Sequence, residues 1–140
     1  MKLFYTYHSS LVLLLVRIIP GLVFLSEGIQ KFLFRETLGA GRFATLGFSH
    51  PEFWAGFTGV FEITCGILLI TGFLARMATV PLLIVMMVAF ISTKLPMLEQ
   101  KGIWAMLHEG RADFAMVISL IIILLNGPGN WSLDQGIKRR

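Results

Sequence analysis

The stretch at residues 11–34 reads LVLLLVRIIPGLVFLSEGIQKFLF. It is longer than the roughly 20 apolar residues that a bilayer-spanning helix needs. Similar stretches follow at residues 54–74, 77–96 and 108–126. A helix satisfies its own backbone groups in lipid, and the strand-like alternation of a barrel is absent. We therefore predict an all-α fold, with one domain over residues 1–140 that forms an integral membrane bundle of four transmembrane helices.

The composition supports this prediction and excludes several classes of protein. Of the 140 residues, 56% are hydrophobic and 14% are charged. Four spans take about 80 residues, which leaves no room for a soluble catalytic domain. The formal charge of +4 is scattered between apolar runs, so we expect no nucleic-acid partner. With one cysteine and three histidines that lack metal-ligand spacing, we also expect no disulfide, no metal site and no intrinsic cofactor.

The connections between the spans differ in character. The segment GFLAR at residues 72–76 predicts a tight hairpin between the second and third spans. The longer connection at residues 35–51 is rich in glycine and carries an apolar streak through Phe43, Leu46 and Phe48, which predicts a short interfacial helix. The segment NGPGN at residues 126–130 ends the last helix, because glycine and proline do not continue it.

The basic residues suggest an orientation in the membrane. If Lys31, Lys94 and Arg111 are counted with the helices, five basic residues lie at the end with both termini and three at the other end. The five are Lys2, Arg76, Lys138, Arg139 and Arg140. The positive-inside rule then places both termini in the cytoplasm. Counting all basic residues of the second end would make the two ends nearly equal.

Ionisable side chains inside the spans point to a site, because they are costly in lipid and usually face the interior of a bundle. In the first span, Arg17, Gly21, Gly28 and Lys31 share one helix face at roughly 100° per residue. Glu27 precedes Lys31 by one turn, in the order that favours an ion pair. One face of the first helix therefore carries cations and small residues together.

The second span has a matching stripe. Gly59, Glu62 and Gly66 place small residues on either side of a single carboxylate, which predicts close approach to a neighbouring helix. Depth along the helices brings these charges toward one half of the bundle, reached from the non-cytoplasmic side. We predict a polar intramembrane binding pocket there. Its candidate residues are Glu62, Lys31, Glu27, Arg17, Lys94 and Asp113.

A structural role competes with this interpretation for each residue. Paired charges in a helical bundle also act as devices that set register and orientation. Arg17 and Lys94 lie near enough to an interface to extend their charged ends toward water. Asp113 also fits a cap of the last helix, beside a solvated entry loop.

The order and spacing of several short motifs resemble the DoxX family of small bacterial and archaeal membrane proteins. The motifs are Arg17, GIQKF at residues 28–32, FE at 61–62, Gly66, GFLAR at 72–76, KLP at 94–96 and GPGNWSLD at 127–134. The resemblance covers nearly the whole chain and implies a four-helix bundle in the plasma membrane. It also implies an association with redox chemistry, since relatives include a subunit linked to thiosulfate or quinol oxidation and members tied to oxidative or thiol stress. Only Arg17, Lys31, Glu62 and Arg76 carry over, as recurring polar positions without a catalytic role.

These observations lead to a hypothesis for function with two alternatives. The first is an accessory protein whose polar pocket holds a quinone head group or a small anion beside a partner oxidoreductase. The alternatives are a small transporter or permeation protein, which four helices allow only as a homo-oligomer, and a purely structural subunit. No residue in the chain transfers electrons unaided, so catalysis by the isolated chain is not predicted.

Overall fold

The computed structural model describes the backbone of residues 2–138 and the side chains of residues 11–137. Lys2 and the basic residues 138–140, which entered the orientation argument, therefore have side chains outside the described part. Within it every regular element is helical, as predicted. The elements, in chain order, are α1 (Lys2–Leu33), α2 (Ala40–Thr45), α3 (Pro51–Thr71), α4 (Ala75–Ala89), the π-helical turn η1 (Phe90–Lys94), α5 (Leu95–Lys101), α6 (Ile103–Asn126) and α7 (Leu133–Lys138).

The predicted spans match the long helices, with shifted ends. By length and apolar composition, Leu11–Leu33, Pro51–Thr71 and Ala75–Lys101 are able to cross a membrane. The fourth predicted span corresponds to α6, which has 24 residues. It is long enough to cross, but Glu109, Arg111 and Asp113 lie in its first half. Three helices thus qualify by composition, and the crossing of α6 stays a prediction.

Local chemistry explains where the helices begin and end. The second span begins at Pro51, three residues before the predicted start, because proline is favoured in the first turn of a helix. It ends at Thr71, since Gly72 has φ 69° and donates to the carbonyls of Leu68 and Leu69. Gly102, at φ 82°, similarly separates α5 from α6. These ends come from glycine and proline rather than from a change in hydropathy.

The third span is one continuous rod built from α4, η1 and α5. Pro96 has no N–H to give to the carbonyl of Ser92, and the chain widens into the π-helical turn just before it. The hydroxyl of Ser92 donates to the Val88 carbonyl at 2.7 Å and that of Thr93 to the Ala89 carbonyl at 2.5 Å. This irregular turn places Lys94 at its end.

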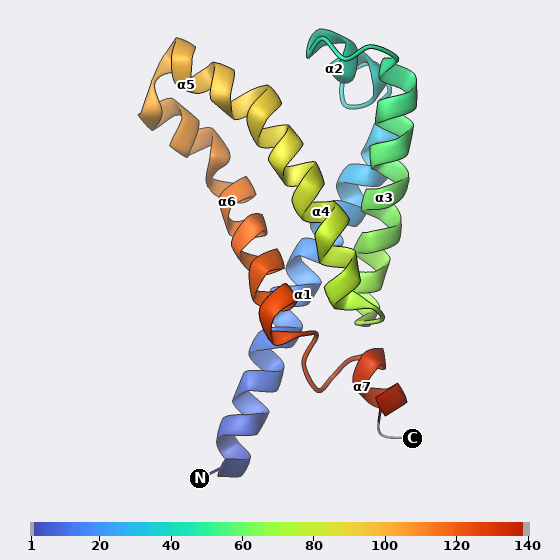
Figure 1. The fold of residues 1–140 in the computed structure, drawn as a ribbon, viewed down its shortest axis with the longest axis vertical. Helices are drawn as coiled ribbons and strands as arrows, with labels where there is room; N and C mark the ends of the chain where they lie inside the picture. Colours follow the sequence, from blue (N-terminus) through green and yellow to red (C-terminus); the bar gives the residue numbers. More distant parts are fainter. Residues whose placement is uncertain (1, 139–140) are drawn as a thin grey trace.

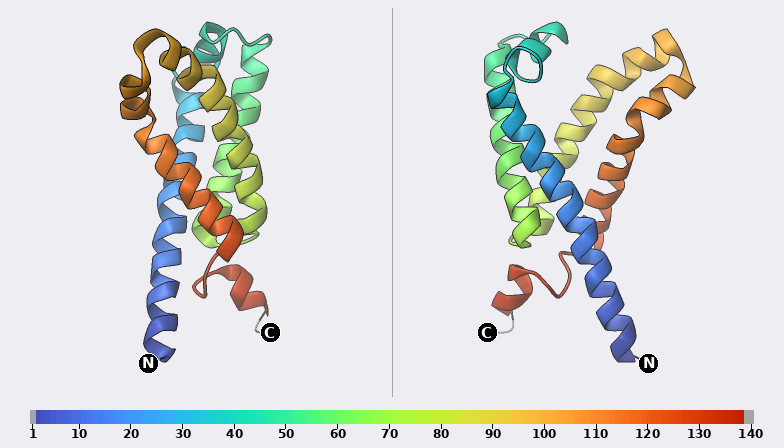
Figure 2. Two further views of the ribbon diagram at one scale, coloured as in Figure 1. Left: turned by 60° about the vertical axis from the view of Figure 1, so that its left-hand side comes forward. Right: turned by 180° about the vertical axis from the view of Figure 1, so that it is seen from behind.

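The molecule is V-shaped in Figure 1 and, from behind, in Figure 2. One arm holds α1 and α3 side by side, with α2 at its tip; the other holds η1, α5 and most of α6. The arms join at the end that holds both termini and the hairpin between α3 and α4. The buried core lies near that junction and draws on all four long helices. Its members are Phe24, Cys65, Leu69, Ala75, Ala78, Leu82, Met86, Met116, Leu120 and Ile123.

The first connection contains the short helix that the sequence predicts. α2 packs against α3, and Phe43, Leu46 and Phe48 are half-buried there. The rings of Phe43 and Phe48 have centroids 5.2 Å apart. The position of α2 at a membrane interface stays a prediction.

Candidate functional site

The centre of the candidate site is an ion pair between α1 and α3. Lys31 Nζ lies 2.6 Å from Glu62 Oε2, and the side chains are 12% and 5% exposed. The same Oε2 atom has no hydrogen bond of good angle. The contact is a close ion pair between an ammonium and a carboxylate. The Glu62 carboxylate is therefore buried against the Lys31 ammonium.

Glycines let the two helices approach closely enough to form this pair. A Cβ added to Gly28 would lie 2.7 Å from the carbonyl oxygen of Gly59. One added to Gly66 would lie 2.8 Å from the carbonyl oxygen of Gly21. The two stripes of small residues that the sequence places on α1 and α3 thus face each other. The glycines of α3 that the sequence predicts at a helix contact therefore contact α1 of the same chain.

The predicted ion pair between Glu27 and Lys31 is not formed. Glu27 is exposed, and Lys31 instead contacts Glu62. The physical reason is burial, because an unpaired carboxylate at 5% exposure would cost more than an unpaired one at the surface. Glu27 and Arg42 nevertheless lie close enough to interact electrostatically with Glu62. The Glu27 carboxylate repels the charge of Glu62, and the Arg42 guanidinium attracts it. Arg42 belongs to α2, so the first connection contributes a charge next to the pair.

Lys94 and Asp113 form a second ion pair on the other arm. Lys94 Nζ lies 3.1 Å from Asp113 Oδ2 and also donates to the carbonyl of Glu109 at 3.3 Å. Asp113 is not the cap of the last helix, because α6 begins at Ile103 after Gly102. The pair joins the π-helical turn to α6, away from the arm of α1 and α3 (Figure 1).

Arg17 lies apart from both pairs and holds the C-terminal segment. It is 2% exposed, and its guanidinium donates to the carbonyls of Pro128 at 2.9 Å and Trp131 at 2.8 Å. A longer bond of 3.5 Å reaches the carbonyl of Ile70. The six candidate residues thus fall into separate places: two ion pairs, Glu27 beside the first pair, and Arg17. Ligand binding by any of them stays a prediction.

The sequence reasoning missed a cluster at the end of the molecule that holds the C-terminus. Asp134 Oδ1 accepts from the backbone N–H of Leu74 at 2.9 Å, and Oδ2 accepts from that of Ala75 at 3.3 Å. Asp134 therefore caps the first turn of α4 from a distant part of the chain. The sequence held one signal of this contact. Leu74, at the N-cap of α4, has no side chain that accepts a hydrogen bond, so the first N–H groups of α4 need an acceptor from elsewhere.

The site chemistry is that of acids and bases. Among residues 11–137, no group of three or more His, Cys, Asp or Glu side chains is arranged to hold a metal ion. Cys65 is a buried free thiol. In such a pair the lysine ammonium donates hydrogen bonds, the carboxylate accepts them, and the two groups can exchange a proton. The residues thus fit a ligand with a carbonyl or acidic oxygen.

Comparisons with known proteins bear on the family. The profile of the DoxX family matches residues 12–95, which is more than half of the chain. An uncharacterized membrane protein of Mycobacterium tuberculosis is 47% identical over 131 residues, covering 89% of this chain and 80% of that protein. No solved structure matches the chain. Together with the helical fold and its apolar spans, these matches show that the chain is a multi-pass membrane protein and belongs to the DoxX family.

Proposed function

We propose that this protein is an accessory subunit of a plasma-membrane redox system, in which the Lys31–Glu62 pair binds the head group of a quinone or a small anion. The observation that carries the proposal is the 2.6 Å contact between two side chains that are both nearly buried. Groups of this kind inside a membrane protein commonly mark ligand sites or proton paths. Electron transfer would be carried out by a partner oxidoreductase, because no residue of this chain transfers electrons unaided.

The two side chains suit the two kinds of oxygen in such a head group. Lys31 is a cation with three donors, and it would hold a carbonyl or anionic oxygen. The Glu62 carboxylate, whose Oε2 atom lies 2.6 Å from Lys31 Nζ, has further lone pairs that would accept from a hydroxyl. A bound quinone would supply the electron-carrying chemistry that the chain lacks. The chain's own part is to orient the head group and to hold a proton at the Glu62 carboxylate.

A structural subunit is the second candidate, and the closed geometry of the pair favours it. An ion pair at a tight helix crossing also sets the register of α1 against α3 without any ligand. The two functions differ in their response to removing both charges. If the protein is a structural subunit, replacing the pair with apolar side chains of similar size should leave the protein folded and functional. If the pair binds a ligand, the same replacement should abolish binding.

The test is quinone binding by the purified protein in mild detergent, with a short-chain quinone as probe and fluorescence quenching of Trp54 and the other tryptophans as readout. We expect the Glu62→Gln variant to bind at least tenfold more weakly than wild type. Glu52→Gln is the matched control, since Glu52 is an exposed acid in the first turn of the same helix. It should bind as wild type does.

The double variant Lys31→Met with Glu62→Met keeps the test decisive if single variants unfold. It leaves no unpaired charge, so its thermal unfolding midpoint should remain near that of wild type. Loss of quinone binding in this folded variant supports the proposal. Binding equal to that of wild type contradicts it and favours the structural role. Mass spectrometry of co-purified quinone, compared between wild type and the double variant, provides a second readout.

A further inference from the structure

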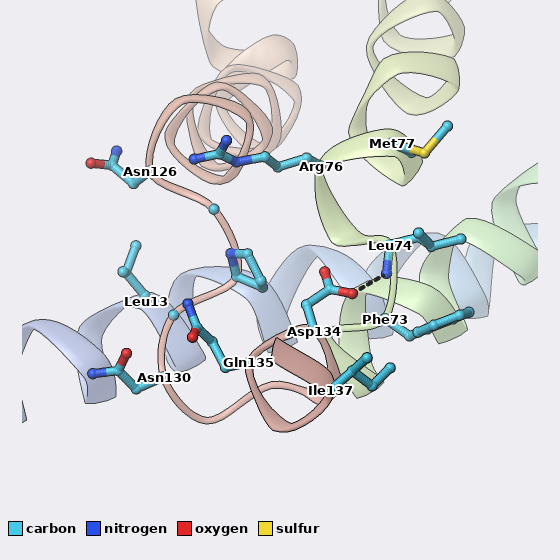
Figure 3. Close-up of a pocket in the computed structure, with 13 residues that line it drawn as sticks. Leu13, Phe73, Leu74, Arg76, Met77, Asn126, Asn130, Asp134, Gln135 and Ile137 are labelled. Atoms are coloured by element: carbon cyan, nitrogen blue, oxygen red, sulfur yellow. Dashed lines mark hydrogen bonds between the residues drawn. The ribbon is translucent and has the colours of Figure 1, made fainter. Parts of the chain in front are cut away.

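A cavity lies at the end of the molecule that holds the α3–α4 hairpin and the C-terminal segment, and the proposed function does not use it. Its volume is about 560 Å³, within the usual range of roughly 300–1,000 Å³ for small-molecule sites. Arg76, Asn126, Asn130 and Gln135 contribute polar groups to its wall. Leu13, Phe73 and Met77 contribute apolar ones (Figure 3). The cavity is therefore amphipathic.

Arg76 is the cation of this cavity. Its Nη2 atom donates to the carbonyl of Leu125 at 3.1 Å, which anchors the guanidinium to the end of α6. Gly127 leaves room for it, because an added Cβ would lie 3.2 Å from Arg76 Nε. No carboxylate within residues 11–137 forms an ion pair with Arg76. A guanidinium has five donors, so most of those of Arg76 remain for a ligand.

The acid in the cavity wall, Asp134, forms no ion pair with Arg76. The two oxygens of Asp134 accept from the backbone N–H groups of Leu74 and Ala75. Asp134 also interacts electrostatically with the buried Arg17. The carboxylate is thus already engaged on the side of α4, as the dashed bond to Leu74 in Figure 3 illustrates. Arg76 is the one basic side chain of the described cavity wall, and its guanidinium has no carboxylate partner within residues 11–137.

We propose that this cavity binds a phosphate-bearing group through Arg76, with the head group of an anionic phospholipid as its source. Arginine matches the geometry of phosphate oxygens with paired N–H donors. The cavity lies at the start of α4 and the end of α6. The apolar side chains of its wall could contact an acyl chain, and the polar ones a head group. Basic pockets between membrane helices bind anionic lipid head groups.

The experiment measures lipid binding to delipidated protein in detergent by native mass spectrometry, with phosphatidylglycerol, phosphatidylcholine and inorganic phosphate as separate probes. We expect wild type to bind phosphatidylglycerol in preference to phosphatidylcholine. Arg76→Gln should weaken phosphatidylglycerol binding about tenfold, the effect of losing one charge-assisted contact. Arg35→Gln is the charge-matched control, since Arg35 lies in the connection before α2, at the opposite end (Figure 1), and should leave binding unchanged.

Additional probes and variants distinguish the possible outcomes of this experiment. Inorganic phosphate that binds Arg76-dependently and as tightly as phosphatidylglycerol shows a phosphate site with a soluble ligand and overturns the lipid source. Equal lipid binding by wild type and Arg76→Gln overturns the whole proposal. If Arg76→Gln does not fold, Arg76→Lys and Gln135→Leu replace it. The first keeps the charge but loses the paired N–H donors, and the second alters a half-buried cavity residue, so each should weaken phosphatidylglycerol binding several-fold.

Discussion

Arg17 is a buried cation whose guanidinium donates hydrogen bonds to the backbone carbonyls of Pro128, Trp131 and Ile70. Its bonds to Pro128 and Trp131 fasten the C-terminal segment to the first helix. Gly72 leaves space for this guanidinium, because a Cβ at that position would overlap Arg17 Nη1. These carbonyls stabilise the buried guanidinium, since each hydrogen bond to a charged donor is worth about 1.5–3 kcal/mol, although Arg17 Nε has no acceptor among the described residues. Arg17 therefore anchors the C-terminal segment to α1 through hydrogen bonds to its backbone.

Replacing Arg17 tests this role at the scale of one residue. Arg17→Met retains an unbranched side chain of similar width but removes the guanidinium. The carbonyls of Pro128 and Trp131 then lose their donor. We expect a loss of roughly 3 kcal/mol in unfolding free energy and earlier proteolysis in the C-terminal segment. Chemical unfolding in detergent and limited proteolysis measure the two effects. The exposed Arg35→Met serves as control, and equal behaviour of both variants would contradict the fastening role.

At the scale of elements, the contact of α1 with α3 depends on glycines in both helices. Gly28 and Gly66 each lie against backbone of the facing helix, so no side chain fits there without separating the helices. Such contacts are typical of membrane helices, where packing replaces the hydrophobic effect as the driving force. The close approach is also what lets Lys31 reach Glu62.

Two glycines of α3 provide a matched comparison for this packing. A Cβ at Gly66 would lie 2.8 Å from the Gly21 carbonyl oxygen, whereas one at Gly56 would meet nothing within 4 Å. We expect Gly66→Ala to destabilise the protein by about 1–3 kcal/mol through overpacking. Gly56→Ala should be neutral or stabilising by up to about 1 kcal/mol, because alanine favours helix. Thermal unfolding midpoints compare the two, and an equal effect would refute the packing argument.

At the scale of the whole molecule, the two arms keep the two ion pairs apart. Lys31–Glu62 belongs to the arm of α1 and α3, and Lys94–Asp113 to the arm of η1 and α6 (Figure 1). Depth along single helices predicted that these charges lie in the same half of the molecule. It carried no information on the lateral separation of the helices, and so a single cluster of charges was expected.

The course of the chain through the membrane is tested by labelling introduced cysteines in intact cells. In a Cys65→Ala background, Ser49→Cys and Gln100→Cys should react with an impermeant reagent added outside. Gly136→Cys should react only after the membrane is opened. The ribbon places the segments of Ser49 and Gln100 at one end and α7 at the other (Figure 1). Labelling of Gly136→Cys together with Gln100→Cys would show that α6 does not cross, and a full reversal would refute the cytoplasmic termini.

The sequence by itself determined the helical class, the approximate spans and the faces of α1 and α3 that meet, because hydropathy and helical period are properties of neighbouring residues. Only the tertiary structure decided which partners the buried charges take. Lys31 contacts Glu62 in place of Glu27, Arg17 bonds a carbonyl 111 positions away, and Asp134 caps a helix 60 positions away. Such choices depend on which distant groups packing leaves buried and unpaired, and no local pattern contains that information.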